Sequence, residues 1–442
     1  MRERGITAPA WGVIVAVLLI AAAVAVPALT RWGVFAGSFP PLHATWDPRI
    51  GPGTIPTLTL AVLTIRFAAD LARRLRWGVL LLVVVVASAA WMISLALVDG
   101  LGGIGTILDA KTEYLRTARI VVDIPGLLRD YIANIPVHSA HHWPVHVAGH
   151  PPGALLFFVG LVHLGLGSGL AAGFVVIAIA ATTPAAVLIT LKRLGALDEA
   201  RIAAPFLVFG PAAIWMAVSA DAVFGAVAAW GLCCLAIAAT AKRPLAIVAW
   251  SLASGVLLGC CVMLSYGLPL LAVLAVAVLW AARSWRPLPG AAAAAAAVIV
   301  AFAVAGFAWW QAYPVLVARY WDGIAAVRPY GYWVWGDLAA LAICAGPILG
   351  ASIALAVPRL PRWRDPNLGS RVVTILTAAA ALAVLLADLS GMSKAEVERI
   401  WLPFVPWLLL GTALLPPRWR RGALAAQLVL AIVVQHLLAT RW

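Results

Sequence analysis

The chain has 442 residues, of which 64% are hydrophobic and only 11% are charged. Soluble domains carry about 25% charged residues, so this composition excludes an ordinary soluble domain and predicts an all-α polytopic membrane protein. The formal net charge of +14 could suggest a nucleic-acid partner. The basic residues stand in short clusters between apolar runs, however, which is typical of topology signals and of contact with anionic lipids. We therefore expect membrane lipids, and no nucleic acid, as partners.

All five cysteines lie within apolar runs. Buried cysteine usually behaves as a small hydrophobe, so neither a disulfide framework nor a zinc knuckle is indicated. The N-terminus has a charged start followed by an apolar run at 11–30 that is long enough to span a bilayer. We interpret this segment as a signal anchor and first membrane helix.

Thirteen apolar runs approach the roughly 20 residues that a helix needs to cross the hydrocarbon core. These runs lie near 11–30, 54–72, 78–98, 170–190, 202–218, 222–240, 245–263, 267–282, 290–310, 338–357, 372–389, 400–415 and 423–439. A shorter run, 151–166, begins with a double proline. If 151–166 does not cross, most basic clusters share the N-terminal side, as the positive-inside rule requires. The sequence thus predicts about thirteen spans, an interfacial or re-entrant helix at 151–166 and a cytoplasmic N-terminus.

Three regions follow from this topology. Residues 1–78 form two N-terminal transmembrane helices joined by the outer loop 31–53. Residues 79–415 form a transmembrane core that carries the large outer loop 99–153. Residues 416–442 form a C-terminal transmembrane helix.

The loop 99–153 is the longest polar interruption, and loops of this length are usually functional or disordered. Apolar residues recur at helical spacing over 106–134, which predicts two short amphipathic surface helices with a break near Pro125–Gly126. Asp109 and Glu113 are four residues apart, so a helix would project both carboxylates from one face. The simpler interpretation of this pair is a solvated helix face that is neutralised by nearby Lys and Arg.

The same loop contains histidines at every fourth position, which on a helix would form a metal-binding stripe. These are His138, His142, His146 and His150. Pro144 and Pro151 disfavour helical dihedrals at the residues that precede them, so we expect the stripe to be broken and assign no metal ligands. We expect His150 to form hydrogen bonds with a phosphate or a sugar.

Other ionisable residues stand where outer loops meet apolar runs. Asp221 lies in the SADA turn, and Glu398 and Arg399 directly precede the run that begins at Ile400. Ionisable groups at membrane depth are usually functional, and arginine binds oxyanions bidentately. A helix cap explains Asp221 about as well, and an ordinary snorkelling side chain explains Arg399.

Six motifs occur in a definite order along the chain. They are TEYLRTA (112–118), GHPPGALLFF (149–158), LKRLG (191–195), SADAVF (219–224), SYGLPLL (265–271) and EVERIWLPF (396–404). In this order, and over about residues 79–410, the chain resembles the GT-C superfamily of integral-membrane glycosyltransferases. Within that superfamily, its length and its HPPG and EVERIW elements look most like actinobacterial enzymes of the methylthioxylose transferase type, which modify the mannose caps of lipoglycans.

The resemblance implies a GT-C-like helix bundle in the bacterial plasma membrane, a polyprenyl-phosphate-linked sugar donor and a cell-envelope glycan or lipoglycan acceptor. It also implies that a loop carboxylate near the first surface helix acts as the general base. The Asp-Glu pair of the family is missing, since the sequence reads Thr112-Glu113-Tyr114 with Asp109 one turn earlier. The base therefore stays open among Glu113, Asp109 and Asp47. The expected substrate-binding residues are His150, Asp99, Asp221, Tyr266, Arg328, Glu398 and Arg399.

The superfamily is compatible with a divalent metal, but no cofactor is firmly expected from these residues. A transporter or lipid flippase is the competing class, and it would place charges and broken helices within the membrane. A structural scaffold is a third class. The polar residues gather instead in outer loops, which favours an enzyme over both.

Overall fold

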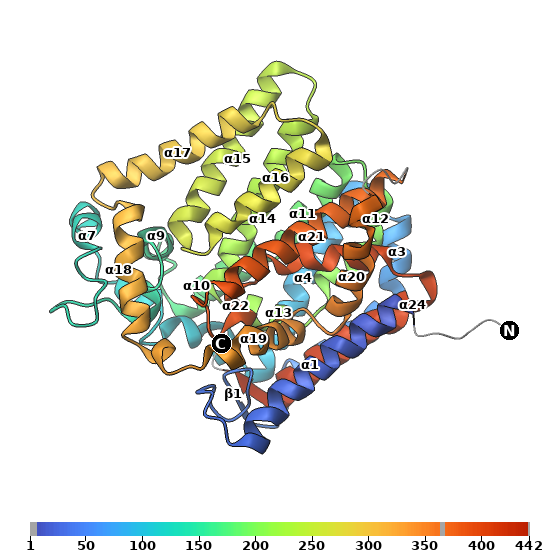
Figure 1. The fold of residues 1–442 in the computed structure, drawn as a ribbon, viewed down its shortest axis with the longest axis horizontal. Helices are drawn as coiled ribbons and strands as arrows, with labels where there is room; N and C mark the ends of the chain where they lie inside the picture. The colour runs from blue at the N-terminus through green and yellow to red at the C-terminus, as the bar shows by residue number, and fades with distance from the viewer. Residues whose placement is uncertain (1–6, 363–366, 441–442) are drawn as a thin grey trace.

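The computed structural model describes residues 7–362 and 367–440 and is almost entirely helical in these ranges (Figure 1). Seven helical stretches of the described chain are long and apolar enough to cross a membrane. They are α1 (Ala8–Thr30), Thr54–Arg74, Trp77–Asp99, Gly169–Arg193, α14 (Ala220–Thr240), α15 (Pro244–Leu264) and α21 (Leu368–Leu389). The chain is therefore an all-α protein with the helices of a multi-pass membrane protein.

Three of these stretches contain more than one element. Thr54–Arg74 consists of α2 (Thr54–Leu63), a π-helical turn η1 (Thr64–Ala68) and α3 (Ala69–Arg74). Trp77–Asp99 consists of α4 (Trp77–Ala96) and a 3-10 turn η2 (Leu97–Asp99). Gly169–Arg193 consists of α10 (Gly169–Ala180) and α11 (Thr183–Arg193).

Two further helix pairs are long and apolar enough only when taken together, because each is bent. The helices α17 (Leu288–Val304) and α18 (Trp309–Trp321) meet at 73°. The helix α19 (Tyr330–Cys344) meets the stretch Ile348–Pro361 at 106°, and that stretch contains α20 (Ile348–Ala356) and most of the 3-10 segment η6 (Val357–Arg362). If each bent pair counts as one span, the described residues hold up to nine.

The other four predicted runs are short, interrupted or polar. Run 202–218 is divided between α12 (Leu197–Val208) and α13 (Ala213–Met216), with Pro211 between them. Run 267–282 is a shorter helix of η4 (Leu268–Leu270) and α16 (Leu271–Ala282). Run 400–415 divides among α22 (Val397–Ile400), α23 (Val405–Leu408) and η7 (Leu409–Leu414), and run 423–439 falls in α24 (Pro417–Leu437), which carries Gln427 and Gln435.

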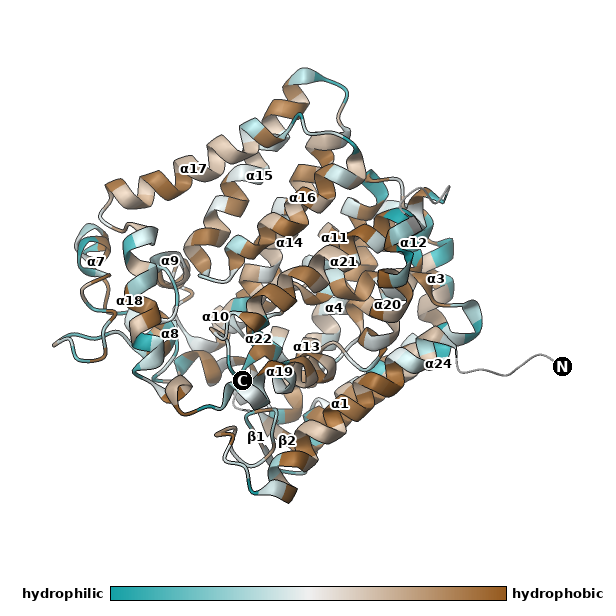
Figure 2. Ribbon diagram, in the orientation of Figure 1, coloured by the Kyte–Doolittle hydropathy of each residue, from teal (hydrophilic) through white to brown (hydrophobic). Residues whose placement is uncertain are grey.

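Apolar residues dominate the helices throughout the bundle, as the brown ribbons of Figure 2 show. Leu18 of α1, Leu82 and Val86 of α4 and Leu245 of α15 are all exposed. By contrast, α14 is buried along most of its length and packs against α10, α11, α15 and α16. An apolar exterior around a buried central helix is the arrangement that lipid, rather than water, would solvate.

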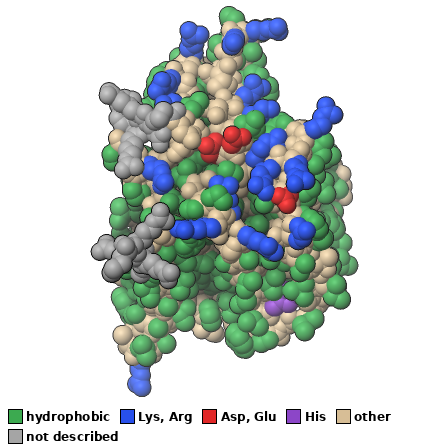
Figure 3. Space-filling model, turned by 90° about the vertical axis from the view of Figure 1, so that its right-hand side faces the viewer, with side chains coloured by type: hydrophobic (Ala, Val, Ile, Leu, Met, Phe, Trp, Pro, Cys, Tyr) green, Lys and Arg blue, Asp and Glu red, His purple; other side chains and the backbone are tan. Residues whose placement is uncertain are grey.

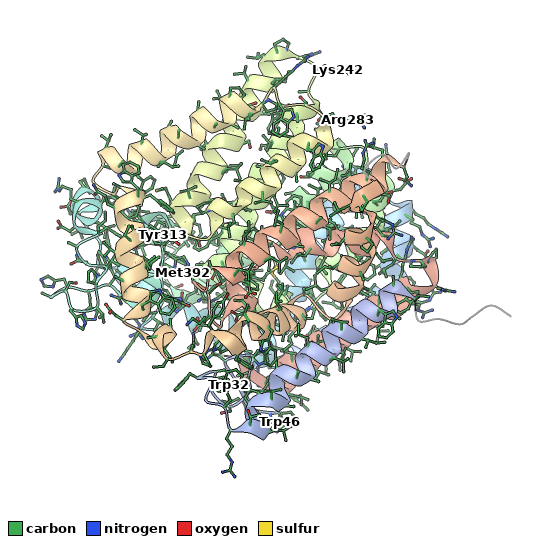
Figure 4. All side chains as sticks on the ribbon, viewed as in Figure 1. Trp32, Trp46, Lys242, Arg283, Tyr313 and Met392 are labelled. Atoms are coloured by element: carbon green, nitrogen blue, oxygen red, sulfur yellow. The ribbon has the colours of Figure 1, made fainter. Side chains whose placement is uncertain are left out.

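The loops predicted to face opposite sides lie at opposite ends of the bundle. Figure 4 places Lys242 and Arg283, in two basic turns, at one end. The same view places Trp32, Trp46, Tyr313 and Met392, in loops predicted to be outer, toward the other. The separation of the two sets of loops agrees with the predicted sidedness.

Outer loop 31–53 is tied to the other end of the chain. Its strand β1 (Ala44–Trp46) pairs antiparallel with β2 (Leu438–Thr440), so that Ala44 lies opposite Thr440. These two strands form the only sheet among the described residues.

The loop 99–153 folds into several short helical pieces. They are α5 (Gly102–Gly105), η3 (Ile107–Asp109), α6 (Tyr114–Ala118), α7 (Ile124–Asp130) and α8 (Val145–Ala148). Two short helices, α6 and α7, lie in the stretch predicted to form them, and the break between them falls at 119–123, just before the predicted position. Pro125 and Gly126 themselves lie in the first turn of α7, where proline is tolerated. The next helix, α9 (Pro152–His163), has only 12 residues. At 1.5 Å per residue it is about 18 Å long, short of a roughly 30 Å hydrocarbon core.

Candidate active site

Glu113 stands at the start of α6 in extended conformation, four residues after the 3-10 turn η3 ends at Asp109. Its side chain is buried, and Oε1 lies 3.6 Å from Nδ1 of His146 on α8. The backbone N–H of His146 donates to the Thr112 carbonyl oxygen at 3.2 Å, which fixes α8 beside the start of α6. One buried carboxylate and one buried imidazole thus face each other within the large loop.

Tyr114 and His150 extend this contact toward α9. The Tyr114 hydroxyl lies 2.8 Å from Nδ1 of His150, within hydrogen-bond distance. The Tyr114 ring stacks on Phe158 of α9 at a centroid distance of 5.3 Å. His150 is therefore held between α6, α9 and the apolar core.

Arg399 brings distant parts of the chain together. Its Nη1 donates to Oδ2 of Asp221 at 2.6 Å, and its Nη2 donates to Oε2 of Glu396 at 3.3 Å. Asp221 is in the first turn of α14, 178 residues away from Arg399 on α22. Both partners of the Asp221–Arg399 pair are buried, so the ion pair is shielded from solvent.

Electrostatic interactions link the Glu113–His146 contact and the ion pairs of Arg399 into one site. Burial raises the pKa of Glu113 to about 7, and Asp221 and Glu396 act in the same direction while Arg399 opposes them. Burial would lower the pKa of Arg399, but the three neighbouring carboxylates raise it above its ordinary value. Glu113 therefore changes protonation near neutral pH beside a permanent positive charge.

The two histidines are neutral in this setting. Burial lowers the pKa of His146 well below its ordinary value, and the charge of Arg399 adds to the effect. Burial also lowers the pKa of His150. A neutral imidazole beside Glu113 can orient a hydroxyl group through a hydrogen bond, and it does not form an ion pair with the carboxylate as a charged imidazolium would.

The segment that carries Glu396 has a strained backbone. Ala395 and Glu396 both adopt left-handed conformations, with φ of 72° and 63°. Oδ1 of Asp337 accepts a hydrogen bond from the Ala395 N–H at 2.9 Å, and the Tyr320 hydroxyl accepts one from the Lys394 N–H at 2.9 Å. Non-glycine residues in this region cost energy and persist only where surrounding contacts hold them, often at functional sites.

Arg328 joins this segment to the first outer loop. Its guanidinium donates to the carbonyl oxygen of Lys394 at 2.7 Å and of Phe35 at 3.4 Å, and it lies 2.6 Å from Nε2 of His43. Oε1 of Glu396 is 3.9 Å away. Arg328, a predicted substrate contact, is thus surrounded by protein groups that connect the Lys394–Glu396 segment to the first outer loop.

No family model matches this chain, and neither a curated protein nor a solved structure matches it.

The other two candidates for the general base lie apart from Glu113. Asp109 pairs with Arg119 at 2.6 Å and is partly exposed. The one-face prediction for Asp109 and Glu113 is wrong, because η3 ends at Asp109 and the chain becomes extended at Ala110. Asp47 is exposed, and its backbone N–H bonds to the Leu437 carbonyl.

The remaining predicted residues divide between the site and its surroundings. Asp99 pairs with Arg49 and accepts a hydrogen bond from Gln435, so its carboxylate is used in fixing the first outer loop. Glu398 is buried beside the site, and burial raises its pKa to about 8. Tyr266 packs against Trp309 and Tyr313, and its buried hydroxyl has no hydrogen-bond partner among the described residues.

The histidine stripe does not form. His138, His141 and His142 are exposed in a turn, and only His146 lies on the short helix α8. In the described part of the chain, no three His, Cys, Asp or Glu side chains come together as a metal ion would require. We assign no chemical step to a metal.

Sequence reasoning did not select His146, Tyr114 or Glu396 as site residues. Two of the three had a local signal, since Tyr114 adjoins Glu113 and His146 precedes His150 by one helical turn. Glu396 shares the EVER motif with Arg399, but its left-handed backbone has no sequence signal because no glycine occupies the position.

Proposed function

We propose that this chain is an integral-membrane glycosyltransferase of the GT-C type, which transfers a sugar from a polyprenyl-phosphate donor to a cell-envelope glycan or lipoglycan. The observation that carries the proposal is Glu113, a buried carboxylate whose pKa is raised to about 7. General bases work best when their pKa lies near the operating pH.

In the proposed reaction, a hydroxyl oxygen of the acceptor attacks the anomeric carbon of the donor, and the bond from that carbon to the phosphate oxygen breaks. The phosphate leaves with the bonding electrons, and Glu113 accepts the hydroxyl proton. Arg399 supplies positive charge close to Glu113, where it stabilises the negative charge that develops. Inversion at the anomeric carbon follows from the family analogy.

His146 and His150 have orienting roles in this scheme. The Nδ1 atom of His146 lies 3.6 Å from Glu113, and His150 is fixed by Tyr114. Asp221 and Glu396 hold the guanidinium of Arg399 in place. Burial of the whole group excludes water, which strengthens each electrostatic interaction.

The finer parts of the proposal rest on the sequence. They are a bundle of about thirteen spans in a bacterial plasma membrane, an N-terminus in the cytoplasm and a site at the outer face. Methylthioxylose transfer to mannose caps is the narrowest form of the proposal. The long apolar helices support a multi-pass membrane protein. The position of Lys242 and Arg283 away from Trp32, Trp46, Tyr313 and Met392 supports a two-sided arrangement of the loops (Figure 4).

A transporter or lipid flippase is the second candidate. The bends of 73° and 106° within two apolar helix pairs favour it, because discontinuous helices are common at transporter binding sites. The strained turn at Ala395–Glu396 follows α21 rather than interrupting a helix, so it does not add to this case.

The test is a transfer assay on the purified full chain in lipid vesicles. Radiolabelled polyprenyl-phosphate sugars are supplied one at a time with a mannoside acceptor, and the labelled product and any movement of label across the bilayer are both measured. We expect one donor to give labelled mannoside. Movement of lipid or solute across the bilayer, with no product from any donor, would establish the transporter instead.

A further inference from the structure

Three turns bring basic side chains to one end of the helix bundle. They are the α3–α4 turn, the end of α11 with the following α12, and the start of α24. The basic residues are Arg73, Arg74, Arg76, Lys192, Arg193, Arg201, Arg418, Arg420 and Arg421. The contacts of α12 with α3 and with α24, and the interaction of Arg420 with Arg73, place the three turns side by side. We call these nine residues and Trp77 the Trp77 surface.

Figure 3 shows the side of the molecule where α3, α12 and α24 lie in Figure 1. Lys and Arg are frequent on this face, and Asp and Glu are few. Among the acidic residues, Asp70 pairs with Arg73, and Asp198 and Glu199 lie in the first turn of α12, where the helix dipole favours them. Among the described residues, these carboxylates do not neutralise the surface.

Trp77 is the centre of this surface. Nζ of Lys192 lies 4.7 Å from the centroid of the Trp77 ring, and Cζ of Arg201 lies 5.9 Å from it, so both cations contact the indole. Arg201 also donates to the carbonyl oxygens of Ala72 at 2.6 Å and Leu75 at 3.1 Å. Arg201 therefore fixes the end of α3 against α12 and holds the Trp77 ring beside Lys192.

Several of these cations have no acidic partner. Within residues 7–362 and 367–440, Lys192, Arg201 and Arg420 form no salt bridge. Arg73 and Arg420 are near enough for their like charges to repel each other. Like charges held together in this way favour an external anion that bridges them.

We propose that the Trp77 surface binds the headgroup of an anionic phospholipid. The surface lies where apolar helices end, at Arg74 and Arg193, which is where a bilayer changes from acyl chains to headgroups. A tryptophan flanked by cations fits that boundary, because the ring is stable half in lipid and the cations reach the phosphate. This inference does not depend on the proposed transfer reaction.

The experiment measures lipid binding to the purified full chain by native mass spectrometry, with phosphatidylglycerol and phosphatidylcholine as probes. We compare the wild type with a variant carrying Arg74→Gln, Lys192→Gln and Arg420→Gln. A control carries Lys242→Gln, Arg243→Gln and Arg283→Gln, which removes the same charge from the turns after α14 and α16, where no residue of the Trp77 surface lies (Figure 4 labels Lys242 and Arg283). Each basic side chain near anionic lipid contributes a factor of about five, so the first variant should bind phosphatidylglycerol roughly a hundredfold more weakly.

We expect the control to retain wild-type affinity and phosphatidylcholine to bind weakly to all three proteins. Equal loss in both variants, or displacement of the lipid by soluble glycerol phosphate at equal concentration, would overturn the proposal. If the triple variant does not fold, Lys192→Gln alone serves as the test. It should weaken phosphatidylglycerol binding about fivefold, and unchanged binding would overturn the proposal.

Discussion

Glu113 differs from the other carboxylates of the large loop in its surroundings rather than in its chemistry. Asp109 is partly exposed and neutralised by Arg119, whereas Glu113 is buried beside His146 and is influenced by Arg399. A carboxylate in water is ionised at pH 7 and is a weak base. Removal from water makes Glu113 a stronger base at the same pH, which is the property that proton abstraction from a sugar hydroxyl requires.

The pH dependence of transfer should report this carboxylate. Burial raises the pKa of Glu113 to about 7, and only the ionised form can accept a proton. Below that pH the active fraction, and with it kcat/KM, should fall about tenfold per pH unit, since one proton must be lost. Above it, activity should level off. Initial rates between pH 5 and 9 test this, and a profile that falls steadily from pH 5 to 8 would exclude Glu113 as the base.

Arg399 should be important for stability as well as for catalysis. Replacing it with Gln leaves Asp221 buried without its counter-charge, and breaking one side of a buried ion pair costs about 3–5 kcal/mol. Denaturant unfolding in detergent would measure the loss. Arg129→Gln is a matched control, because Arg129 is exposed, and it should change stability by less than about 0.5 kcal/mol. Equal effects of the two substitutions on stability would contradict the description of Arg399 as the partner of a buried ion pair.

At the scale of the elements, the turn at Ala395–Glu396 beside the site has a strained backbone, with two consecutive left-handed residues. Ala395 is buried at φ 72°, and an L-residue in this region costs roughly 1–2 kcal/mol. Ala395→Gly should therefore stabilise the fold slightly, even though glycine loses more entropy on folding. Ala342→Gly in the interior of α19 should instead destabilise it by about 1 kcal/mol. Unfolding measurements on both variants give the sign of each change in the free energy of unfolding. A change of the same sign in both variants would contradict the description of this turn as strained.

The long helices could be predicted from the sequence because about twenty consecutive apolar residues leave few alternatives to a spanning helix. The positions at which apolar runs break into separate helices could not be predicted from the sequence. Pro211 separates two helices, yet Pro27 lies inside α1 without ending it, so the effect of a proline depends on its neighbours. The pairing of Asp109 with Glu113 failed for a related reason. Helical spacing has meaning only where a helix forms, and here the 3-10 turn ends at Asp109 and the next residue is extended.

At the scale of the whole molecule, the sequence identified the residue types of the site but not their partners. Asp221, Glu398 and Arg399 were selected because they stand at membrane edges, and all three are buried beside one another or beside Glu396. Which carboxylate meets Arg399 depends on how α14 and α22 pack, which no local pattern records. Asp47 and Asp99 were selected on the same grounds, but tertiary structure places them at the surface.

The sidedness of the bundle makes a prediction for intact cells. His141 lies in the large loop and Lys242 in a basic turn, and both are exposed. The native cysteines are buried except Cys260, which is partly accessible. In a Cys260→Ala background, a membrane-impermeant maleimide should label His141→Cys from outside the cell and Lys242→Cys only after permeabilisation. The opposite order would invert the proposed orientation.

The central claim is that Glu113 is the general base of a sugar transfer, and one comparison tests it most directly. Once a donor is known, kcat is measured for the wild type, Glu113→Gln and Asp109→Asn in the same lipid. We expect Glu113→Gln to lose about 10²–10⁴-fold in kcat, because general base catalysis contributes that much, with insertion and donor binding preserved. Asp109→Asn should keep near wild-type activity, since its carboxylate pairs with Arg119 away from the site. Full activity in Glu113→Gln, or loss in Asp109→Asn alone, would contradict the account.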